Sequence, residues 1–242
     1  MLEVKNLSFE VDADGIKKKI IKDVSFTIEK EKLVCITGPN GGGKSTLARL
    51  IAGIEKPTSG KIILNGVDIT GMSITERAKL GVGFAFQQPV RFKGLQVFDL
   101  IKLAKGDNIN VSTACEYLSA VGLCARDYID REVNNSLSGG ELKRIEIATL
   151  LAKGSILSIF DEPEAGIDLW SFQNLIQVFK NMRSNIKDSS ILIISHQERI
   201  LNIADELIVI RDGEIAEMGD RDKVLPKLIG ASAPVTACSK LS

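Results

Sequence analysis

Residues 38–45 read GPNGGGKS and complete a G-x-x-x-x-G-K-S loop, an arrangement that cradles the phosphates of a nucleoside triphosphate. Its glycines let successive backbone N–H groups turn inward, and the helix expected at 45–54 adds the positive end of its dipole. Lys44 is expected to bridge the β- and γ-phosphates, and the Ser45 hydroxyl to ligate Mg²⁺. The nucleotide-binding residues predicted here are Gly38, Pro39, Asn40, Gly41, Gly42, Gly43, Lys44, Ser45 and Thr46.

Two acids, Asp161 and Glu162, follow the apolar run ILSIF at 156–160, a pattern typical of a strand that is buried on both faces of a sheet. Ligands of such sheets bind at the carboxyl ends of the strands, so both carboxylates are expected at the edge that also carries the phosphate loop. Asp161 would hold Mg²⁺. Glu162 would point elsewhere and polarise the attacking water, which predicts hydrolysis of the bound triphosphate.

A second phosphate-binding device lies at 137–141 (LSGGE), where a helix is expected to begin. Ser138, Gly139 and Gly140 would expose N–H groups at the N-terminus of that helix. The structural alternative is an ordinary capping box of Ser138 and Glu141, and both interpretations hold together, because a cap leaves those N–H groups presented. One chain does not easily use two such devices on one γ-phosphate. We therefore expect a head-to-tail pair in which each chain gives its Ser-Gly-Gly to the other's nucleotide.

The composition excludes other classes of protein. The 242 residues carry 31 Lys+Arg and 31 Asp+Glu, so there is no excess of positive charge for binding a nucleic-acid backbone. The single histidine excludes a metal site built on two or more imidazoles. The four cysteines match neither a zinc nor an iron–sulfur spacing and are expected to pack as small reduced hydrophobes: Cys35, Cys115, Cys124 and Cys238.

The expected elements place the motifs in an α/β domain. Strands are expected over most of the first 35 residues, around a turn at 12–15, and the later strands are expected at 61–66, 82–86, 156–160 and 191–195. Helices are expected at 45–54, from about 140, and at 171–183, where five apolar side chains share one face. Asp212 and Gly213 have the form of a type I′ turn in a final hairpin.

We expect a single domain over 1–242. Its α/β core of 1–87 and 137–225 combines an N-terminal antiparallel β subdomain with a central mixed or parallel sheet. A helical subdomain at 88–136 interrupts the core, and a loosely structured tail follows at 226–242. The chain shows no signal region and no apolar run near the ~20 residues that span a bilayer, so a cytoplasmic location is expected.

These motifs together resemble the ATP-binding cassette (ABC) ATPases over nearly the full chain. The order matches that family: the phosphate loop, Gln87 after a strand, the signature at 137–141, the acids Asp161 and Glu162, the D-loop AGID at 165–168, and a histidine after a strand. The resemblance implies that ATP and Mg²⁺ are bound. It implies that Gln87 contacts Mg²⁺ and the attacking water, and that Asp168 lies at the seam between two chains.

His196 is the histidine that the resemblance assigns to the γ-phosphate. A lone histidine is more often a structural residue. Here it directly follows the expected strand at 191–195, at the edge where the phosphate loop and Asp161 also emerge. We therefore interpret His196 as catalytic, together with Glu162, Gln87 and Lys44.

Within the family, three stretches resemble SufC, the ATPase of the SUF iron–sulfur cluster assembly system. Residues 138–147 (SGGELKRIEI) are similar to its SGGEKKRNEI, residues 84–90 (FAFQQPV) to AFQYPV, and residues 195–201 (SHQERIL) to THYQRLL. Transporter cassettes usually have glutamine where Glu141 stands. The adenine-stacking aromatic usual near position 11 is replaced by Val11, as in SufC, with Phe9 nearby. The chain departs from SufC at Pro163 and Glu164, and a proline at position 163 is typical of transporter cassettes.

The resemblance implies an ATPase that binds a SufB- or SufD-like scaffold through the surface around 87–95 and the helical insertion. ATP would bring two chains together, and their closure would move the scaffold. The alternative is the nucleotide-binding subunit of an ABC membrane transporter. The cassette chemistry does not separate these two functions.

Overall fold

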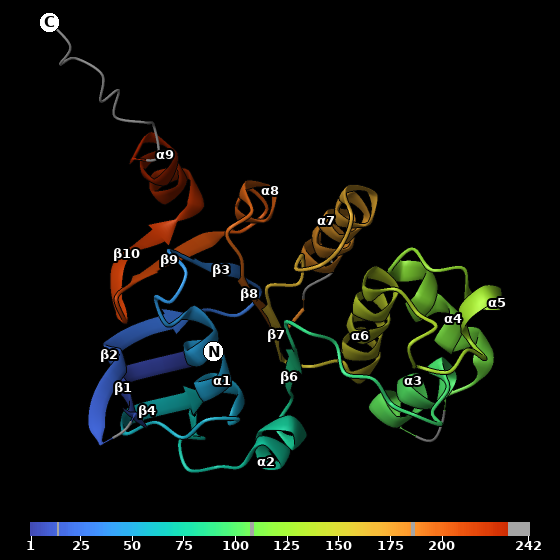
Figure 1. Ribbon diagram of the computed structural model, residues 1–242, viewed down its shortest axis with the longest axis horizontal. Coiled ribbons are helices and arrows are strands. Elements are labelled where there is room, and N and C mark those ends of the chain that lie inside the picture. The colour runs from blue at the N-terminus through green and yellow to red at the C-terminus, as the bar shows by residue number, and fades with distance from the viewer. Residues whose placement is uncertain (14, 107–108, 185–186, 232–242) are drawn as a thin grey trace, which may run out of the picture.

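Two β-sheets, with helices between and around them, build the structure, a computed structural model that describes residues 1–13, 15–106, 109–184 and 187–231 (Figure 1). The smaller sheet has the strand order β2-β1-β4-β5 and the larger one β10-β9-β3-β8-β7-β6. The smaller sheet is antiparallel, and the larger is parallel except for β10. The expected α/β fold with an antiparallel β subdomain and a mixed sheet is confirmed.

The strands are β1 (Leu2–Ala13), β2 (Ile16–Ile28), β3 (Leu33–Thr37), β4 (Ser59–Leu64), β5 (Val67–Asp68), β6 (Val82–Ala85), β7 (Leu157–Asp161), β8 (Ser190–Ile194), β9 (Glu206–Arg211) and β10 (Glu214–Asp220). The helices are α1 (Lys44–Ala52), α2 (Ile74–Lys79), α3 (Val97–Lys105), α4 (Val111–Ala120), α5 (Ala125–Tyr128), α6 (Gly139–Lys153), α7 (Leu169–Ser184), α8 (Glu198–Leu201) and α9 (Arg221–Ala231). No helix among the described residues has the length and apolar character needed to cross a membrane. The elements β5, α2 and α8 had no counterpart in the sequence analysis.

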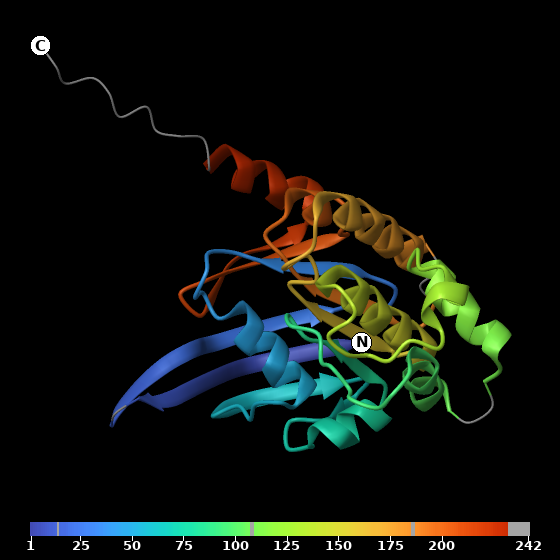
Figure 2. The ribbon, with the colours of Figure 1, turned by 45° about the vertical axis from the view of Figure 1, so that its right-hand side comes forward.

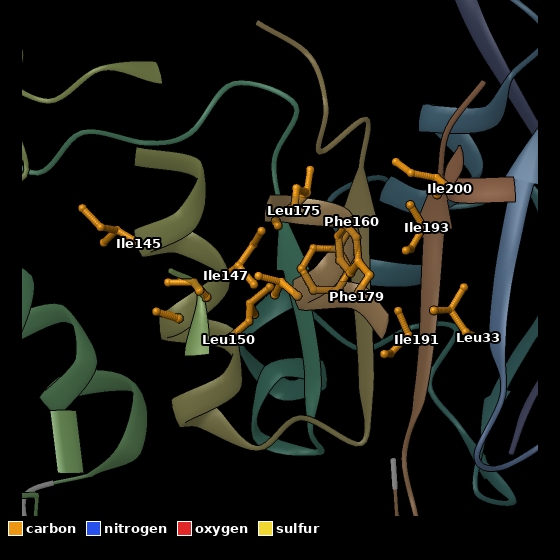
Figure 3. Close-up of a cluster of buried hydrophobic side chains, with 14 of the residues drawn as sticks. Leu33, Ile145, Ile147, Leu150, Phe160, Leu175, Phe179, Ile191, Ile193 and Ile200 are labelled. Atoms are coloured by element: carbon orange, nitrogen blue, oxygen red, sulfur yellow. The ribbon is translucent and has the colours of Figure 1, made fainter. Parts of the chain in front are cut away.

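The larger sheet is buried on both faces, which explains the apolar runs of its strands. Along β3, Leu33 and Cys35 belong to one hydrophobic cluster, whereas Val34 and Ile36 belong to the other. The first cluster joins the sheet to α6 and α7, where the Phe160 and Phe179 rings meet edge to face with their centroids 5.0 Å apart (Figure 3). The second cluster packs α1 between the two sheets.

A buried arginine fixes the end of the helix that follows the phosphate loop. Arg77 of α2 is fully buried, and its guanidinium donates to the carbonyl oxygens of Leu50 and Ile51 in the last turn of α1, at 2.6 and 2.9 Å. It also donates to the carbonyls of Thr70 and Met72, at 2.9 and 3.1 Å. These bonds satisfy terminal carbonyls that a helix cannot pair internally. The helix that begins at the phosphate loop is therefore anchored at its far end.

Residues 88–136 contain α3, α4 and α5. In the described part of this segment, the only β pairing is an isolated bridge between Gln96 and Glu132. The three helices pack with α6 at one end of the large sheet (Figures 1 and 2). α6 itself belongs to the segment that resumes the core, so it links the helical insertion to the sheet.

Two expectations need correction. α9 runs through Pro226 to Ala231, so residues 226–231 are helical and not a loose tail. Val224 and Leu225 are buried in the first cluster, and their packing favours the helix despite the hydrogen bond that proline cannot make. Residues 232–242 lie outside the described part, as does Cys238. Cys35 is buried as expected, but Cys124 is exposed at the start of α5 and does not pack as a core residue.

Candidate active site

The parallel register of the large sheet brings the motifs to one edge. Ile36 of β3 pairs with Ile194 of β8, and Ile194 pairs with Asp161 of β7. The phosphate loop, the residues after Ile194 and the acid Glu162 therefore leave the sheet at the same level. Gln87 follows β6, the next parallel strand along. The sheet thus brings together segments that are far apart in the sequence.

Two glycines of the phosphate loop are required by their surroundings. Gly38 has a φ of 134°, and a Cβ placed on it would lie 2.0 Å from the carbonyl oxygen of Ile210 in β9. Gly43, with a φ of 102°, would carry a Cβ 2.8 Å from the Ile21 side chain of β2. Both conformations favour glycine. A larger residue at position 38 would displace the β9 backbone, and one at position 43 would press on the Ile21 side chain and the Ile20 carbonyl oxygen of β2. The loop is therefore held closely between the two sheets.

The first residues of α1 make the polar contacts expected of a phosphate site. The buried Lys44 ammonium donates to the carbonyl oxygens of Gly38 and Pro39, both at 2.9 Å, which holds it over the loop. The Ser45 hydroxyl donates to Oδ1 of Asp161 at 2.8 Å. Lys44 and Ser45 thus lie where the sequence motif predicts them, and Asp161, the last residue of β7, contacts Ser45 at the start of α1 directly.

A polar cavity of about 330 Å³ lies against the loop, a size suited to a small ligand. Gln87 and Glu162 line it together with Asn40, Gly41, Gly43, Lys44, Ser45, Thr46 and Ile20. No sequence pattern had marked Ile20 as a site residue. Val11 pairs with Lys18 in the outer part of the β1–β2 hairpin and does not line the cavity. The hydrophobic residue that lines the cavity therefore comes from β2, which approaches the loop closely at Gly43.

Glu162 is held in an unusual backbone conformation. Its φ of 43° lies in the left-handed region, which costs free energy for a non-glycine residue. Its N–H donates to the carbonyl of Ile194 at 3.0 Å, and its carboxylate accepts from Nε2 of Gln87 at 2.6 Å. Strained residues cluster at functional sites, where surrounding contacts over-determine them. The sheet edge therefore aims this carboxylate at Gln87, inside the cavity.

The oxygens beside the loop are the kind that Mg²⁺ prefers. Asp161 is almost fully buried, and burial raises its pKa, with a further rise from nearby Glu162 and an opposing effect of the Ser45 hydrogen bond. A divalent cation would favour its charged form. No group of three or more His, Cys, Asp or Glu side chains in the described ranges could hold a metal. An ion here would thus complete its shell with phosphate oxygens and water, as Mg²⁺ commonly does.

Two charged residues of α6 clamp the segment that carries Gln87. The buried Lys143 ammonium donates to the carbonyl oxygens of Phe86 and of Gln87, the latter at 2.7 Å. Glu146 accepts from the backbone N–H of Phe86 at 3.0 Å. Burial lowers the pKa of Lys143 and raises the pKa of Glu146 to about 7. The charge of each residue opposes the pKa shift of the other. A movement of α6 would therefore move Gln87.

The raised pKa of Glu146 predicts a pH-dependent contribution to stability. The folded protein holds this proton up to about pH 7, whereas an unfolded glutamate loses it near 4.5. The folded state binds more protons in this window, so stability falls as the pH rises through it. Relative to Glu146→Gln, we expect the wild-type free energy of unfolding to fall by about 2–3 kcal/mol between pH 4.5 and 8. Urea unfolding of both proteins across this range measures the difference, and a constant difference would contradict the assignment.

The signature and the D-loop lie side by side, away from the cavity lining. The predicted capping box is confirmed: Ser138 Oγ accepts from the Glu141 N–H at 3.3 Å, and the Glu141 carboxylate accepts from the Ser138 N–H at 2.6 Å. A Cβ on Gly139 would lie 3.5 Å from the Gly166 carbonyl oxygen. Asp168 caps α7 by accepting from the Trp170 and Ser171 N–H groups, both at 3.0 Å. None of these residues lines the cavity at the phosphate loop.

His196 also stands outside the cavity lining. Its side chain is 54% exposed, and its Nδ1 lies 4.0 Å from Oε1 of Glu164. Glu164 is largely buried and accepts from the Ser195 hydroxyl, and burial raises its pKa. Residues 195–197 therefore leave β8 with the Ser195 side chain turned inward onto Glu164. The exposed imidazole of His196 lies at the sheet edge, with its Nε2 3.3 Å from Nε2 of Gln197.

Comparisons with known proteins agree on one family. The profile of the ABC transporter family matches residues 21–165. An uncharacterised ABC transporter ATP-binding protein of Methanocaldococcus jannaschii is 41% identical over 215 residues, which cover 86% of this chain and 85% of the relative. The "Probable ATP-dependent transporter ycf16" of Cyanophora paradoxa is 33% identical over 235 residues, covering 90% of this chain and 88% of the relative.

Solved structures share the fold. The dimeric structure of MJ0796, a bacterial ABC transporter cassette, matches with a TM-score of 0.82 at 24% identity and covers 91% of this chain and 99% of that one. A bacterial Atm1-family ABC exporter with ATP bound matches with a TM-score of 0.81 at 24% identity, covering 96% of this chain and 42% of that one.

Proposed function

The chain belongs to the ABC transporter family of ATP-binding cassettes, and on this premise we propose that it hydrolyses ATP to drive a conformational change in a separate partner protein. The observation that carries the proposal is the cavity in which the phosphate loop faces Gln87 and Glu162. Phosphoryl transfer to water requires a phosphate cradle, a positively charged group such as the Lys44 ammonium, and a carboxylate held at a fixed position.

Each of these residues has a definite task. The loop N–H groups and Lys44 bind the β- and γ-phosphates and offset the charge that develops on them. Glu162 accepts a proton from the attacking water, and its 2.6 Å contact with Gln87 orients both side chains. Ser45, Asp161 and Gln87 would hold Mg²⁺, which when bound neutralises phosphate charge. This metal set rests on the donor oxygens at the loop and on the contact between Ser45 and Asp161.

Two chains share each nucleotide in this proposal. Ser138, Gly139 and Gly140 present a capped helix N-terminus, yet they do not line the cavity of their own chain. A head-to-tail pair gives that helix N-terminus a ligand, the γ-phosphate bound to the other chain. Asp168, next to the signature, would then lie at the seam. A single chain would hold half of each active site and hydrolyse ATP slowly.

An apolar groove beside Gln87 offers a place for the partner. It has a volume of about 490 Å³, and its wall contains Phe84, Phe86, Val90, Phe92 and Leu100, from the segment around Gln87 and from α3. Val90 and Phe92 are 45% and 40% exposed. An amphipathic helix of a partner suits such a groove. Lys143 and Glu146 tie the backbone at Phe86 to α6. A partner bound in the groove would therefore shift the positions of Gln87 and of the signature.

A membrane transporter subunit is the partner that the relatives' names favour. The Methanocaldococcus jannaschii and Cyanophora paradoxa proteins both carry transporter names and align with most of this chain. In that case the partner, and not this chain, crosses the membrane.

A SufB- or SufD-like scaffold is the second candidate, and the acids of α6 favour it. Glu141 and Glu146 lie in the stretch that resembles SufC, and both side chains are engaged: Glu141 in the capping box, and Glu146 on the Phe86 N–H. This ATPase would act in iron–sulfur cluster assembly by moving the scaffold, which would hold the cluster.

Co-purification separates the two partners. Tagged protein expressed in its native cells is expected to capture either a polytopic membrane protein or a soluble SufB-like protein. Val90→Asp, which places a charge in the groove without touching the nucleotide cavity, is expected to lower capture at least tenfold and to leave nucleotide binding intact. Mass spectrometry identifies the captured chain. Equal capture by Val90→Asp, or capture of neither class of partner, would overturn the proposal.

A further inference from the structure

The first turn of α6 carries a negative charge where a phosphate is expected to dock. Glu141 stands three residues after Ser138, beside the N–H groups of Gly139 and Gly140. On the proposed function, which this inference takes as its basis, that turn faces the γ-phosphate bound to the other chain. An unbalanced carboxylate there would repel the phosphate, because like charges this close destabilise each other.

The structure shows what balances that charge. The Tyr128 hydroxyl of α5 donates to Oε1 of Glu141, while Oε2 accepts from the Ser138 N–H at 2.6 Å. Nη1 of Arg131 lies 3.8 Å from the same Oε1. The Glu141 side chain is only 19% exposed. Both carboxylate oxygens are thus occupied by donors from this chain.

Arg131 also ties this group to the segment that enters the signature. Its Nη2 donates to the carbonyl oxygen of Ser136 at 3.1 Å, two residues before the cap. Its guanidinium lies over the Tyr128 ring, 5.1 Å from the centroid, which is within the range of a cation–π contact. One arginine therefore contacts the tyrosine, the glutamate and the backbone before Ser138.

The protonation states agree with this arrangement. Burial opposes ionisation of Glu141, but the hydrogen bonds from Tyr128 and Ser138 outweigh it and leave its pKa below the ordinary value. The pKa of Tyr128 is raised, first by its bond to Glu141 and then by burial. Glu141 is therefore a carboxylate that accepts and Tyr128 a phenol that donates, at neutral pH.

We propose that Tyr128 and Arg131 are positioning residues of the signature, which hold and balance the Glu141 carboxylate so that Ser138 and the adjacent N–H groups can receive the γ-phosphate of a second copy of this chain. The acid at position 141 requires this support. A glutamine there can complete the same capping box without the charge. The need for Tyr128 thus depends on Glu141 being an acid.

A double-mutant cycle tests this dependence in a Glu162→Gln background, where ATP is held without turnover. The readout is the MgATP concentration that gives half-maximal pairing by light scattering. Tyr128→Phe is expected to raise it about tenfold, as suits the loss of a hydrogen bond to a charged group. With Glu141→Gln present, the same change is expected to raise it less than about twofold. Tyr117→Phe, at the chain's other tyrosine, in α4, is the matched control and should have no effect.

The outcomes are distinct. A Tyr128→Phe effect that persists with Glu141→Gln would mean that the tyrosine merely supports the helical subdomain, and would overturn the inference. No effect of Tyr128→Phe would also overturn it, while the proposed shared site would stand. If the Glu162→Gln parent does not pair in ATP at all, the shared-site proposal itself fails. Binding of a fluorescent ADP analogue to the single chain should be unchanged in every variant.

Arg131→Gln provides a second test that does not depend on the tyrosine. It is expected to raise the half-maximal MgATP concentration for pairing in the Glu141 background, and much less in the Glu141→Gln background. Thermal unfolding of each variant identifies any that fail to fold. Equal effects in the two backgrounds would overturn the role of Arg131 in balancing the charge.

Discussion

Replacing Glu162 with glutamine is expected to lower ATP turnover by about 10²–10⁴-fold, the usual contribution of a general base, while ATP binding is retained. Glutamine has nearly the same shape and can still contact Gln87, but it cannot take a proton from water. The structure makes this carboxylate the strongest candidate, because it lines the cavity and is held at a φ of 43° by the sheet edge. Phosphate release and binding of a fluorescent ATP analogue measure the two effects separately.

A matched control is available in α2. Glu76 forms a capping box with Ser73, as Glu141 does with Ser138, and it lies outside the cavity. Glu76→Gln makes the same change of acid to amide, and glutamine can serve the same box. Its turnover should equal that of the wild type. If Glu162→Gln also turned over ATP at the wild-type rate, Glu162 would not be the base.

Glu162→Gln should also trap the paired state of two chains. ATP that binds without hydrolysis is expected to hold two chains together, so light scattering should report twice the mass in ATP and the single mass in ADP. Trp170 is the chain's one tryptophan, is 76% exposed and lies two residues after Asp168. Its emission is expected to shift to shorter wavelength when pairing covers this region. The same mass with and without ATP would count against the shared site.

Replacing His196 with alanine is expected to lower turnover by about 10²–10³-fold, the typical loss when one donor to a developing charge is removed. The imidazole emerges after β8 at the edge that carries the phosphate loop, and it is half exposed next to Glu164. In the proposed mechanism it reaches the γ-phosphate, so its loss affects the chemical step more than ATP binding. Turnover measured at saturating ATP tests this expectation.

Two further variants sharpen the test of His196. His196→Asn keeps a hydrogen-bond donor near the same position and is expected to retain more activity than alanine. Glu198→Gln, two residues on at the exposed first turn of α8, is expected to hydrolyse ATP at the wild-type rate. Wild-type turnover by His196→Ala would make the histidine a structural residue.

Local patterns predicted much of this protein correctly. The spacing of glycines in 38–45 predicted a glycine-rich loop between a strand and a helix, because its positive φ angles favour glycine at set positions, and the loop lies between β3 and α1. The apolar run before Asp161 placed a buried strand, and apolar periodicity placed the buried face of α7 at Leu175 and Phe179. The Asp212–Gly213 turn followed from the same kind of signal, and both residues have positive φ.

Contacts between distant residues could not be read in the same way. Ser45 and Asp161 touch although they are 116 positions apart, and Phe86 and Glu146 although they are 60 apart. Parallel strand order and the packing of α6 create these contacts, and no short motif encodes either. For the same reason Ile20 and Tyr128 were missed, since neither belongs to a recognisable pattern.

The sequence by itself therefore determined the fold class, the position of the glycine-rich loop and the candidate acids, because glycine conformation and hydrophobic periodicity act over a few residues. Only the tertiary structure decided what surrounds those groups. It put Ile20 in the cavity, tied Gln87 to α6 through Lys143 and Glu146, and set Tyr128 on the signature glutamate. It also carried α9 through Pro226, because burial of Val224 and Leu225 outweighed the local preference of proline.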